Sequence, residues 1–244
     1  MLSKSEVKYI QSLAQKKFRG EENLYIIEGP KIIDEALTVV PQHIKTIYAL
    51  PEWIETNKKK VSDIEVKEIT EGDIERISLL KTPNKVLALM EIPWSEGFLL
   101  KKNSLVLVLD GIQDPGNVGT IIRIADWFGV TQIICSHDCA DVYNNKVVQA
   151  TMGSIFRVEV FYTNLPDWLP VQNDVPVIGA MLEGIPLNSF GKVKNGLLII
   201  GNESKGIRQE VLPFVNQKVT IEKTGHAESL NAAVATGIIL SYLK

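Results

Sequence analysis

Short apolar runs alternate with helical stretches through the second half of the chain. The run at residues 105–109 (LVLVL) is continuous, which is typical of a strand covered on both faces of a parallel sheet. A helix is expected from Asn117 to Phe128, after a short loop. Further strands are expected at residues 132–135, 157–161, 175–180, 197–200 and 218–221. This alternation of strand and helix predicts an α/β fold with a doubly wound parallel sheet.

The stretch from Ser229 to Leu243 carries no charged residue. A surface helix shows a polar face, so a helix that is apolar all round is expected to be buried. The last helix of a single chain has few neighbouring elements that could bury it on every side, and a partner subunit can supply some of them. The earlier helix ends in Trp127 and Phe128, and aromatic residues are enriched at interfaces. We therefore expect a homodimer, with the first and last helices of this half at the interface.

The first part of the chain has a different, mixed pattern. Ser3 and Glu6 form the sequence signature of a capping box, and apolar residues follow at helical spacing as far as Phe18. Strands are expected at residues 24–27, 44–50, 64–69 and 85–92, with helical stretches between them, one at 31–37. Residues 93–103, which include Gly97, have the character of a linker. We therefore expect a small α/β domain at residues 1–95 and a second domain at residues 103–244.

Composition and charge narrow the class of protein. The 244-residue chain has a formal net charge of −3, which disfavours a nonspecific nucleic-acid binder. Contact with RNA would need a local basic cluster, and Lys16, Lys17 and Arg19 form one. No apolar run approaches the roughly 20 residues of a membrane span, and the first residues lack the apolar region of a signal peptide, so a cytoplasmic protein is expected. Cys135 and Cys139 have no second cluster to complete a metal site, so no metal is expected.

The common nucleotide-binding signatures are incomplete. The spacing of Gly116 and Gly119 does not match the Rossmann pattern. Gly201 and Gly206 have the spacing of P-loop glycines, but Ile207 occupies the lysine position, which disfavours a triphosphate ligand. Both segments nevertheless follow expected strands, and ligands bind at the carboxyl ends of such strands. Gly201 would let the backbone approach a ligand, and Gly206 would permit a tight turn.

Three segments occur in the order of a known set of motifs: residues 114–123 (DPGNVGTIIR), 200–207 (IGNESKGI) and 227–232 (AESLNA). They resemble the motifs of the SpoU (TrmH-like) RNA 2′-O-ribose methyltransferases, a branch of the SPOUT superfamily, and the resemblance extends over residues 103–244. It implies a trefoil-knotted α/β domain, a homodimer, S-adenosylmethionine as cofactor, and methylation of rRNA or tRNA. Residues 1–95 look like the L30e-like RNA-binding domain that precedes the knot in many members.

The resemblance also implies roles for individual residues. The polar residues implied in catalysis are Asn117, Arg123, Glu203, Ser229 and Asn231. The positions implied in cofactor binding are Gly201, Ile221 and Leu230, and Gly206 is added to them because of its expected tight turn. Glu203 is the expected partner of Arg123. Because an arginine side chain has a pKa above about 12, two roles stay open for Arg123. It is either a base activated by pairing and desolvation, or a group that holds the neighbouring phosphate and stabilises the developing alkoxide, and the pKa favours the second.

Two other functions remain compatible with this scaffold. A catalytically silent RNA-binding protein could share it, although the retained polar residues favour an enzyme. Methylation of an RNA base occurs in other SPOUT branches, but the block that contains Asn117 and Arg123 favours the ribose. Glu222 and Lys223 stand where many relatives carry Pro-Met, so the resemblance says less about cofactor affinity than about the type of reaction.

Overall fold

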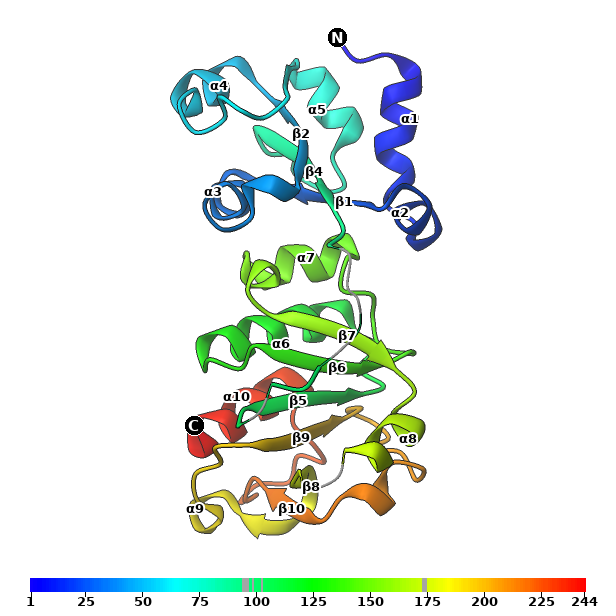
Figure 1. Cartoon of the computed structure of the whole chain (residues 1–244), viewed down its shortest axis with the longest axis vertical. Helices are drawn as coiled ribbons and strands as arrows, with labels where there is room; N and C mark the ends of the chain where they lie inside the picture. The colour runs from blue at the N-terminus through cyan, green and yellow to red at the C-terminus, as the bar shows by residue number, and fades with distance from the viewer. Residues whose placement is uncertain (94–96, 98, 102, 173–174) are drawn as a thin grey trace. The chain divides into compact units, whose positions relative to one another are not determined.

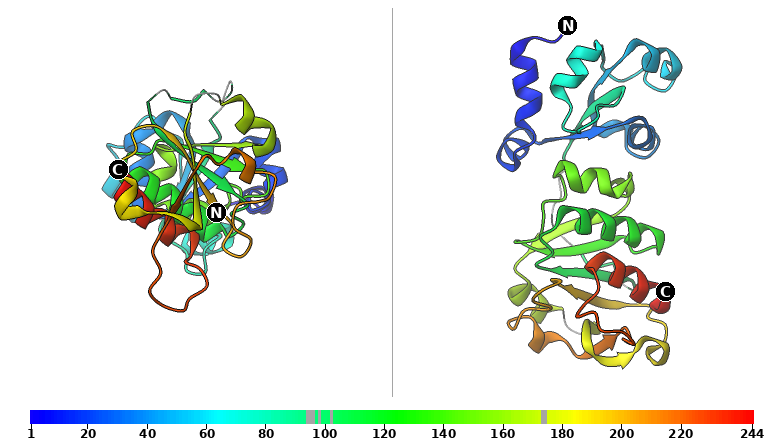
Figure 2. Two further views of the ribbon diagram at one scale, coloured as in Figure 1. Left: turned by 90° about the horizontal axis from the view of Figure 1, so that it is seen from below. Right: turned by 180° about the vertical axis from the view of Figure 1, so that it is seen from behind.

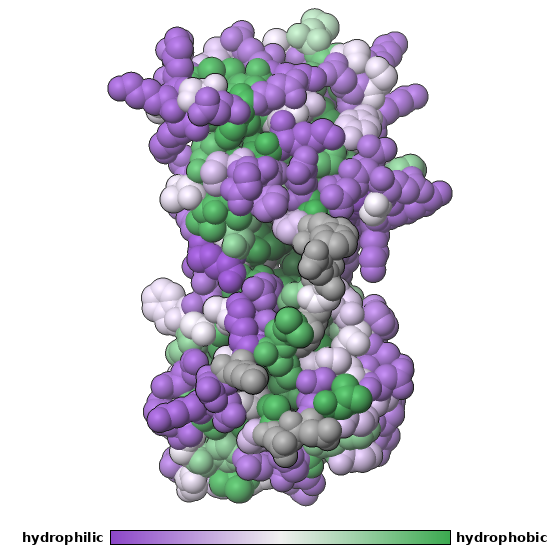
Figure 3. Space-filling view, in the orientation of Figure 1, coloured by the Kyte–Doolittle hydropathy of each residue, from purple (hydrophilic) through white to green (hydrophobic). Residues whose placement is uncertain are grey.

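The computed structural model describes residues 1–93, 97, 99–101, 103–172 and 175–244 (Figure 1). The chain divides into two compact units, one formed by residues 1–96 with 143–156 and the other by residues 97–142 with 157–244. Within the described residues, no helix is long and apolar enough to cross a membrane. On the face shown in Figure 3, apolar side chains emerge in small groups among hydrophilic ones.

The first unit is built on a four-stranded sheet with the order β1-β4-β2-β3. Its strands are β1 (Leu24–Glu28), β2 (Ile44–Ala49), β3 (Val66–Glu68) and β4 (Val86–Glu91). Strand β4 runs antiparallel to β1 and β2, and β3 runs parallel to β2. Successive residues of a strand point to opposite faces. Tyr25 and Ile27 accordingly pack in one apolar cluster and Leu24 and Ile26 in another, so both faces of the sheet are covered.

Helices contribute to both of these clusters. Helices α3 (Pro30–Val39) and α4 (Pro51–Asn57) pack in the cluster of Tyr25, and α1 (Lys4–Ser12) and α5 (Glu71–Ile77) pack in that of Leu24. The predicted capping box is confirmed, because Ser3 Oγ accepts a hydrogen bond from the Glu6 amide and the Glu6 carboxylate accepts one from the Ser3 amide. A mixed α/β fold for this part of the chain is likewise confirmed.

The helix expected to run as far as Phe18 is broken. Helix α1 ends before Leu13, and a separate helix, α2 (Lys16–Glu22), follows a short turn. Arg19 on α2 stabilises this turn, because its Nη1 donates hydrogen bonds to the carbonyl oxygens of Leu13 (2.9 Å) and Ala14 (2.8 Å). The last carbonyls of a helix have no partner within it, so a guanidinium that reaches them is drawn into the interior. Only 4% of Arg19 is exposed.

Helix α7 (Asn145–Thr151) belongs to the first unit, although its sequence lies within the second half of the chain. Val148 is fully buried in the apolar cluster of Tyr25. The rings of Tyr143 and Tyr25 lie 4.7 Å apart between centroids, and Gln149 Nε2 donates a hydrogen bond to the Glu28 carbonyl (2.9 Å). Residues 143–156 therefore complete the core of the first unit, which a division of the sequence between residues 95 and 103 does not anticipate.

The second unit is built on a six-stranded sheet with the order β10-β8-β9-β5-β6-β7, and all its pairings are parallel. Its strands are β5 (Leu105–Asp110), β6 (Gln132–Ser136), β7 (Glu159–Thr163), β8 (Val177–Pro186), β9 (Gly196–Gly201) and β10 (Gln217–Thr220). The chain enters at β5, adds β6 and β7 on one side, and then builds β8, β9 and β10 on the other. The predicted doubly wound parallel sheet is confirmed.

Helices α6 (Pro115–Trp127) and α10 (Ala232–Leu243) pack against each other beside this sheet (Figures 1 and 2). Helix α10 is shorter than the expected stretch 229–243, because Asn231 caps it by accepting hydrogen bonds from the Ala233 and Val234 amides. It is not buried on every side, since Val234 is 51% exposed and Tyr242 is 49% exposed. The expectation of a fully buried last helix is therefore wrong for a single chain.

Candidate active site

The carboxyl ends of β5 and β9 meet at the centre of the six-stranded sheet, where Asp110 lies opposite Gly201. Strand order reverses between these two strands, and ligands bind at such points in open α/β sheets. Three loops leave the carboxyl ends of strands in this unit: residues 111–114 after β5, residues 202–206 after β9, and residues 221–231 after β10. The last two loops carry Glu203, Ser229 and Asn231, and the first leads into α6, which carries Asn117 and Arg123.

A chain of hydrogen bonds joins these three segments. Asn117 Nδ2, on the first turn of α6, donates a hydrogen bond to Glu203 Oε1. Asn231 Nδ2 donates to Asn117 Oδ1 at 2.8 Å. A carboxylate only accepts hydrogen bonds, so the amide nitrogen of Asn117 must face Glu203, which leaves its oxygen for Asn231. The structure thus brings together three of the five polar residues expected in catalysis.

Arg123 is not part of this cluster. Six residues of an α-helix turn through about 240°, so Arg123 and Asn117 leave α6 on different sides. Arg123 is exposed, and in the described part of the chain Glu203 bonds to Asn117 and forms no ion pair with Arg123. The expected pairing of Arg123 with Glu203 is therefore wrong within one chain. One turn further along the same side of α6 lies Trp127, which is 84% exposed.

Both glycines of the second motif are explained by the 202–206 loop itself. A Cβ added at Gly201 would lie 2.3 Å from the carbonyl carbon of Gly206 and 2.4 Å from the amide nitrogen of Ile207. Glycine is thus required at 201 by close packing of backbone on backbone, whereas the sequence suggested close approach of a ligand. Gly206 has a φ of +68°, and the tight turn expected there is confirmed.

The other predicted site residues lie at or beyond the end of β10. Ile221 is half-buried directly after the strand. Ser229 and Leu230 belong to the exposed 221–231 loop rather than to α10, and Leu230 is 45% exposed. These residues therefore remain accessible to a ligand in a single chain.

A bulge in β8 is a feature that sequence reasoning missed. Gly179 pairs with Lys218 and Ile185 with Val219, so residues 180–184 leave the ladder. Leu182 is 78% exposed in this bulge, and Thr220 Oγ1 donates to the Leu182 carbonyl at 3.0 Å. An added Cβ at Gly184 would lie 2.8 Å from backbone atoms of Lys218, so the available signal was a glycine just beyond the strand expected at residues 175–180.

An ion pair at the end of β5 was also missed. Asp110 is fully buried, and its carboxylate accepts hydrogen bonds from Arg208 Nε (2.6 Å) and from the Arg208 amide (2.8 Å). Arg208 Nη1 lies 3.7 Å from Asp138 Oδ1. A buried carboxylate requires such a partner. The signal in the sequence was an aspartate that ends an otherwise apolar run.

The two cysteines lie at the same edge as free, buried thiols. Cys139 Sγ accepts a hydrogen bond from the Ile112 amide at 3.3 Å and so fastens the loop after β5. The Cys135 thiol donates to Cys139, and this bond does most to lower the pKa of Cys139 to about 7. The same contact raises the pKa of Cys135.

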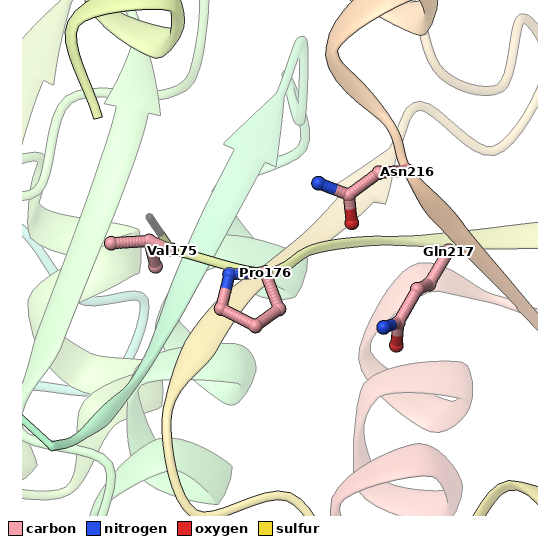
Figure 4. Close-up of a pocket in the computed structure, with 4 residues that line it drawn as sticks. All are labelled: Val175, Pro176, Asn216 and Gln217. Atoms are coloured by element: carbon pink, nitrogen blue, oxygen red, sulfur yellow. The ribbon is translucent and has the colours of Figure 1, made fainter. Parts of the chain in front are cut away.

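The expected RNA-binding cluster divides into surface and interior residues. Lys16 and Lys17 are exposed on α2. Arg19 is buried against the end of α1 and is removed from the candidate RNA contacts. In the second unit, a pocket lined by Val175, Pro176, Asn216 and Gln217 lies at the beginning of β8 and β10, at the edge opposite the three loops (Figure 4).

Fold and site define a doubly wound α/β domain with a polar cluster and exposed apolar residues at its carboxyl edge. Residues 104–241 match the SpoU rRNA Methylase family, and residues 4–88 match the MRM3-like substrate binding domain. The chain belongs to the SpoU rRNA methylase family.

Several relatives align over nearly the whole chain. The 23S rRNA (guanosine(2553)-2′-O)-methyltransferase RlmP of Bacillus subtilis is 31% identical, and the alignment covers 98% of this chain and 96% of that protein. A solved structure of a putative RNA methyltransferase of the TrmH family from Porphyromonas gingivalis is 35% identical, with a TM-score of 0.87 and coverage of 99% of this chain and 98% of that one. An AdoMet-bound rRNA methyltransferase from Sinorhizobium meliloti is 32% identical, with a TM-score of 0.87 and coverage of 99% and 95%.

Proposed function

We propose that this protein transfers the methyl group of S-adenosylmethionine to a ribose 2′-hydroxyl of ribosomal RNA. The observation that carries the proposal is the hydrogen-bonded set of Asn117, Glu203 and Asn231 at the switch point of a SpoU-family sheet. A catalytically silent RNA-binding protein would have no need to hold these groups in one cluster. Membership in an rRNA methylase family favours rRNA over tRNA as the substrate.

The residues at the carboxyl edge fit S-adenosylmethionine. Leu182 in the β8 bulge and Leu230 in the 221–231 loop expose apolar side chains, and Ile221 is half-buried directly after β10. Such side chains suit an adenine ring, and the backbone from Gly201 to Gly206 adds polar groups at the end of β9. When bound, the cofactor supplies a methyl group already activated by a sulfonium centre. Two solved family structures are described as AdoMet-bound or in complex with AdoMet, which supports the choice.

The chain's own residues then have to align the ribose and manage its proton. Asn117 lies between Glu203 and Asn231, so its amide is held in one orientation at the switch point. Ser229 adds a hydroxyl on the exposed loop. Arginine side chains are cations in proteins, and a fixed cation stabilises the negative charge that develops on the 2′-oxygen as its proton leaves. We assign Arg123 to that role, together with contact to the neighbouring phosphate.

We infer a homodimer formed through the outward sides of α6 and α10. Trp127 is 84% exposed, Val234 is 51% exposed and Tyr242 is 49% exposed on these two packed helices. Large apolar residues exposed on two helices that pack together indicate an interaction surface. Arg123 lies on the same side of α6 as Trp127, so dimerisation would place this cation at the seam. Arg123, which makes no ion pair with Glu203 in its own chain, would then complete a site at the interface.

The first unit is proposed to select the RNA. It matches a substrate binding domain, is expected to be L30e-like, and carries Lys16 and Lys17 on its surface. We propose that the domain at residues 1–95 binds the RNA and that the domain at residues 103–244 transfers the methyl group. Deleting residues 1–95 is a poor test, because the core around Val148 of α7 would be uncovered. Charge reversal at the two lysines leaves that core intact. We also propose that the protein is located in the cytoplasm.

The trefoil knot is a further proposal. Strand β10 lies at the outer edge of the sheet, and residues 221–231 carry the chain from there back to α10, which packs on α6. A return of this kind, past β8 and β9, is what a knotted chain end requires. Family membership supports the knot because that fold is the one the three motifs implied.

The test is to map ribose methylation on total RNA from cells with and without the gene. A 2′-O-methyl group blocks alkaline hydrolysis, so the product is an alkali-resistant dinucleotide. We expect one such site to disappear from rRNA without the gene and to return with the wild-type protein. Arg123→Ala should not restore it, since removing one stabilising group typically costs on the order of 10²-fold in rate. An unchanged methylation map would refute the function.

A further inference from the structure

The 202–206 loop is fastened at both ends to the end of one strand. At its beginning, Asn202 Nδ2 donates a hydrogen bond to the Gly111 carbonyl at 2.9 Å. Beyond its end, Arg208 binds the buried carboxylate of Asp110 through its Nε and its backbone amide. Asp110 is the last residue of β5, and Gly111 follows it. Glu203 therefore lies between two attachments to the same strand end.

The loop is also closed on itself. The amide of Asn202 donates to the Gly206 carbonyl (3.1 Å), and the amide of Gly206 donates to the Asn202 carbonyl (2.8 Å). Asn202 Oδ1 accepts further hydrogen bonds from the amides of Ser204 (3.0 Å) and Lys205 (3.2 Å). A loop with this internal bonding moves as one body, so its two attachments decide where Glu203 lies.

We propose that Arg208, together with Asp110, is a positioning pair that holds Glu203 in hydrogen-bonding distance of Asn117. The inference rests on the proposed function, because it assigns the pair an effect on methyl transfer. Arg208 acts through the loop, and its own guanidinium lies against Asp110 and 3.7 Å from Asp138. The geometry of an arginine suits this task, since its planar fork satisfies a carboxylate in a fixed orientation.

Asp138 strengthens the same arrangement from the end of β6. Its Oδ1 accepts a hydrogen bond from Ser136 Oγ at 2.6 Å, and Ser136 Oγ accepts one from the Gly111 amide at 2.9 Å. Arg208 thus links the loop to carboxylates at the ends of two neighbouring strands. Loss of Arg208 leaves the Asn202 hydrogen bond as the remaining attachment to the end of β5, and the loop can then pivot about it.

The experiment compares Arg208→Gln, Glu203→Gln and the double variant in kcat for methyl transfer, with a radiolabelled methyl donor and rRNA. We expect Arg208→Gln to lower kcat by on the order of 10²-fold, because a misplacement of about 1 Å has that effect. In the Glu203→Gln background the same change should lower kcat by less than about threefold, since groups that act as one unit are not additive. Losses that multiply would overturn the proposal.

Arg157→Gln is the matched control, because Arg157 also pairs with a carboxylate, Asp126 (2.8 Å), but just before β7, at the opposite edge of the sheet. It should reduce thermal stability and leave kcat unchanged. Arg208→Lys keeps a cation beside Asp110, so it replaces Arg208→Gln if that variant does not fold. Its kcat is expected to lie below that of wild type, and a kcat equal to wild type would overturn the proposal.

A second measurement needs neither cofactor nor RNA. Hydrogen–deuterium exchange in the 201–207 segment should become faster in Arg208→Gln and stay unchanged in Arg157→Gln. Unchanged exchange would refute the positioning role even if activity fell. If the wild-type protein transferred no methyl group to rRNA, the proposed function would fail, and the exchange data would still decide whether Arg208 holds the loop.

Discussion

Replacing Gly201 by alanine tests whether packing of the 202–206 loop positions the active-site carboxylate. The added Cβ would lie 2.3 Å from the Gly206 carbonyl carbon, 2.6 Å from its oxygen and 2.4 Å from the Ile207 nitrogen. All three are backbone atoms, so rotation of a side chain cannot relieve the overlap. The loop has to move away from β9 and would carry Glu203 with it.

The size of the effect follows from what this movement breaks. Two backbone hydrogen bonds close the loop, from Asn202 to Gly206 (3.1 Å) and from Gly206 to Asn202 (2.8 Å). At a net contribution of about 1 kcal/mol each, their loss lowers the free energy of unfolding by about 2 kcal/mol. This lies within the range of about 1–3 kcal/mol that over-packing usually costs. Methyl transfer should fall by on the order of 10²-fold, because Glu203 is displaced by about 1 Å or more.

Gly237→Ala is the control. Gly237 lies on α10, and an added Cβ there would meet only Ile124 Cδ1 of α6, at 3.6 Å, which is an ordinary contact between the two helices. Alanine is favoured over glycine in a helix by roughly 0.5–1 kcal/mol. Urea unfolding and methyl-transfer assays are run on both variants. A Gly201→Ala protein with wild-type activity and an unfolding free energy within about 0.5 kcal/mol of wild type would contradict the loop geometry described here.

Three further outcomes are expected. Lys16→Glu with Lys17→Glu should weaken RNA binding and reduce the slope of log affinity against log salt by roughly one per lost phosphate contact; an unchanged slope would exclude α2 from the RNA interface. Val234→Asp, on an exposed position of α10, should convert a dimer into a species of 27.1 kDa by light scattering while the fold persists; a wild-type protein already of that mass would refute the dimer. Burial raises the pKa of Glu28 above its ordinary value despite hydrogen bonds from Ser78 and Leu79, so in the pH window between the ordinary and the raised pKa the native state binds more protons than the unfolded chain. The stability of the wild-type protein therefore falls as pH rises through this window. The glutamine of the Glu28→Gln variant does not titrate, so in urea unfolding the stability of this variant relative to wild type should rise by at most about 1.4 kcal/mol per pH unit. A stability difference that does not depend on pH would contradict the burial argument.

Patterns local to the sequence were sufficient for much of the fold. The continuous apolar run at 105–109 predicted a strand buried on both faces, and β5 is such a strand. The capping box at Ser3 and the turn at Gly206 were predicted because each depends on residues only a few positions apart. The three motif segments were found in order, and the cluster of Asn117, Glu203 and Asn231 joins one residue from each.

The reasons for particular residues needed the tertiary structure. Lys16, Lys17 and Arg19 look alike as a basic cluster, yet Arg19 alone is buried, because its guanidinium reaches carbonyls at the end of α1. The break between α1 and α2 that creates those carbonyls was not visible in the apolar spacing. Gly201 suggested a ligand contact, but the atoms it must avoid are the backbone of residues 206 and 207.

The sequence by itself determined the parallel sheet, the motif loops and the family, since these depend on local periodicity and on short segments with fixed spacing. Only the tertiary structure decided which groups meet across long separations. It pairs Glu203 with Asn117 rather than Arg123, it pairs Asp110 with Arg208, and it assigns α7 to the first unit. The physical reason is that a side chain's partner depends on the direction in which its helix or loop presents it, and that direction is fixed by packing between elements far apart in the chain.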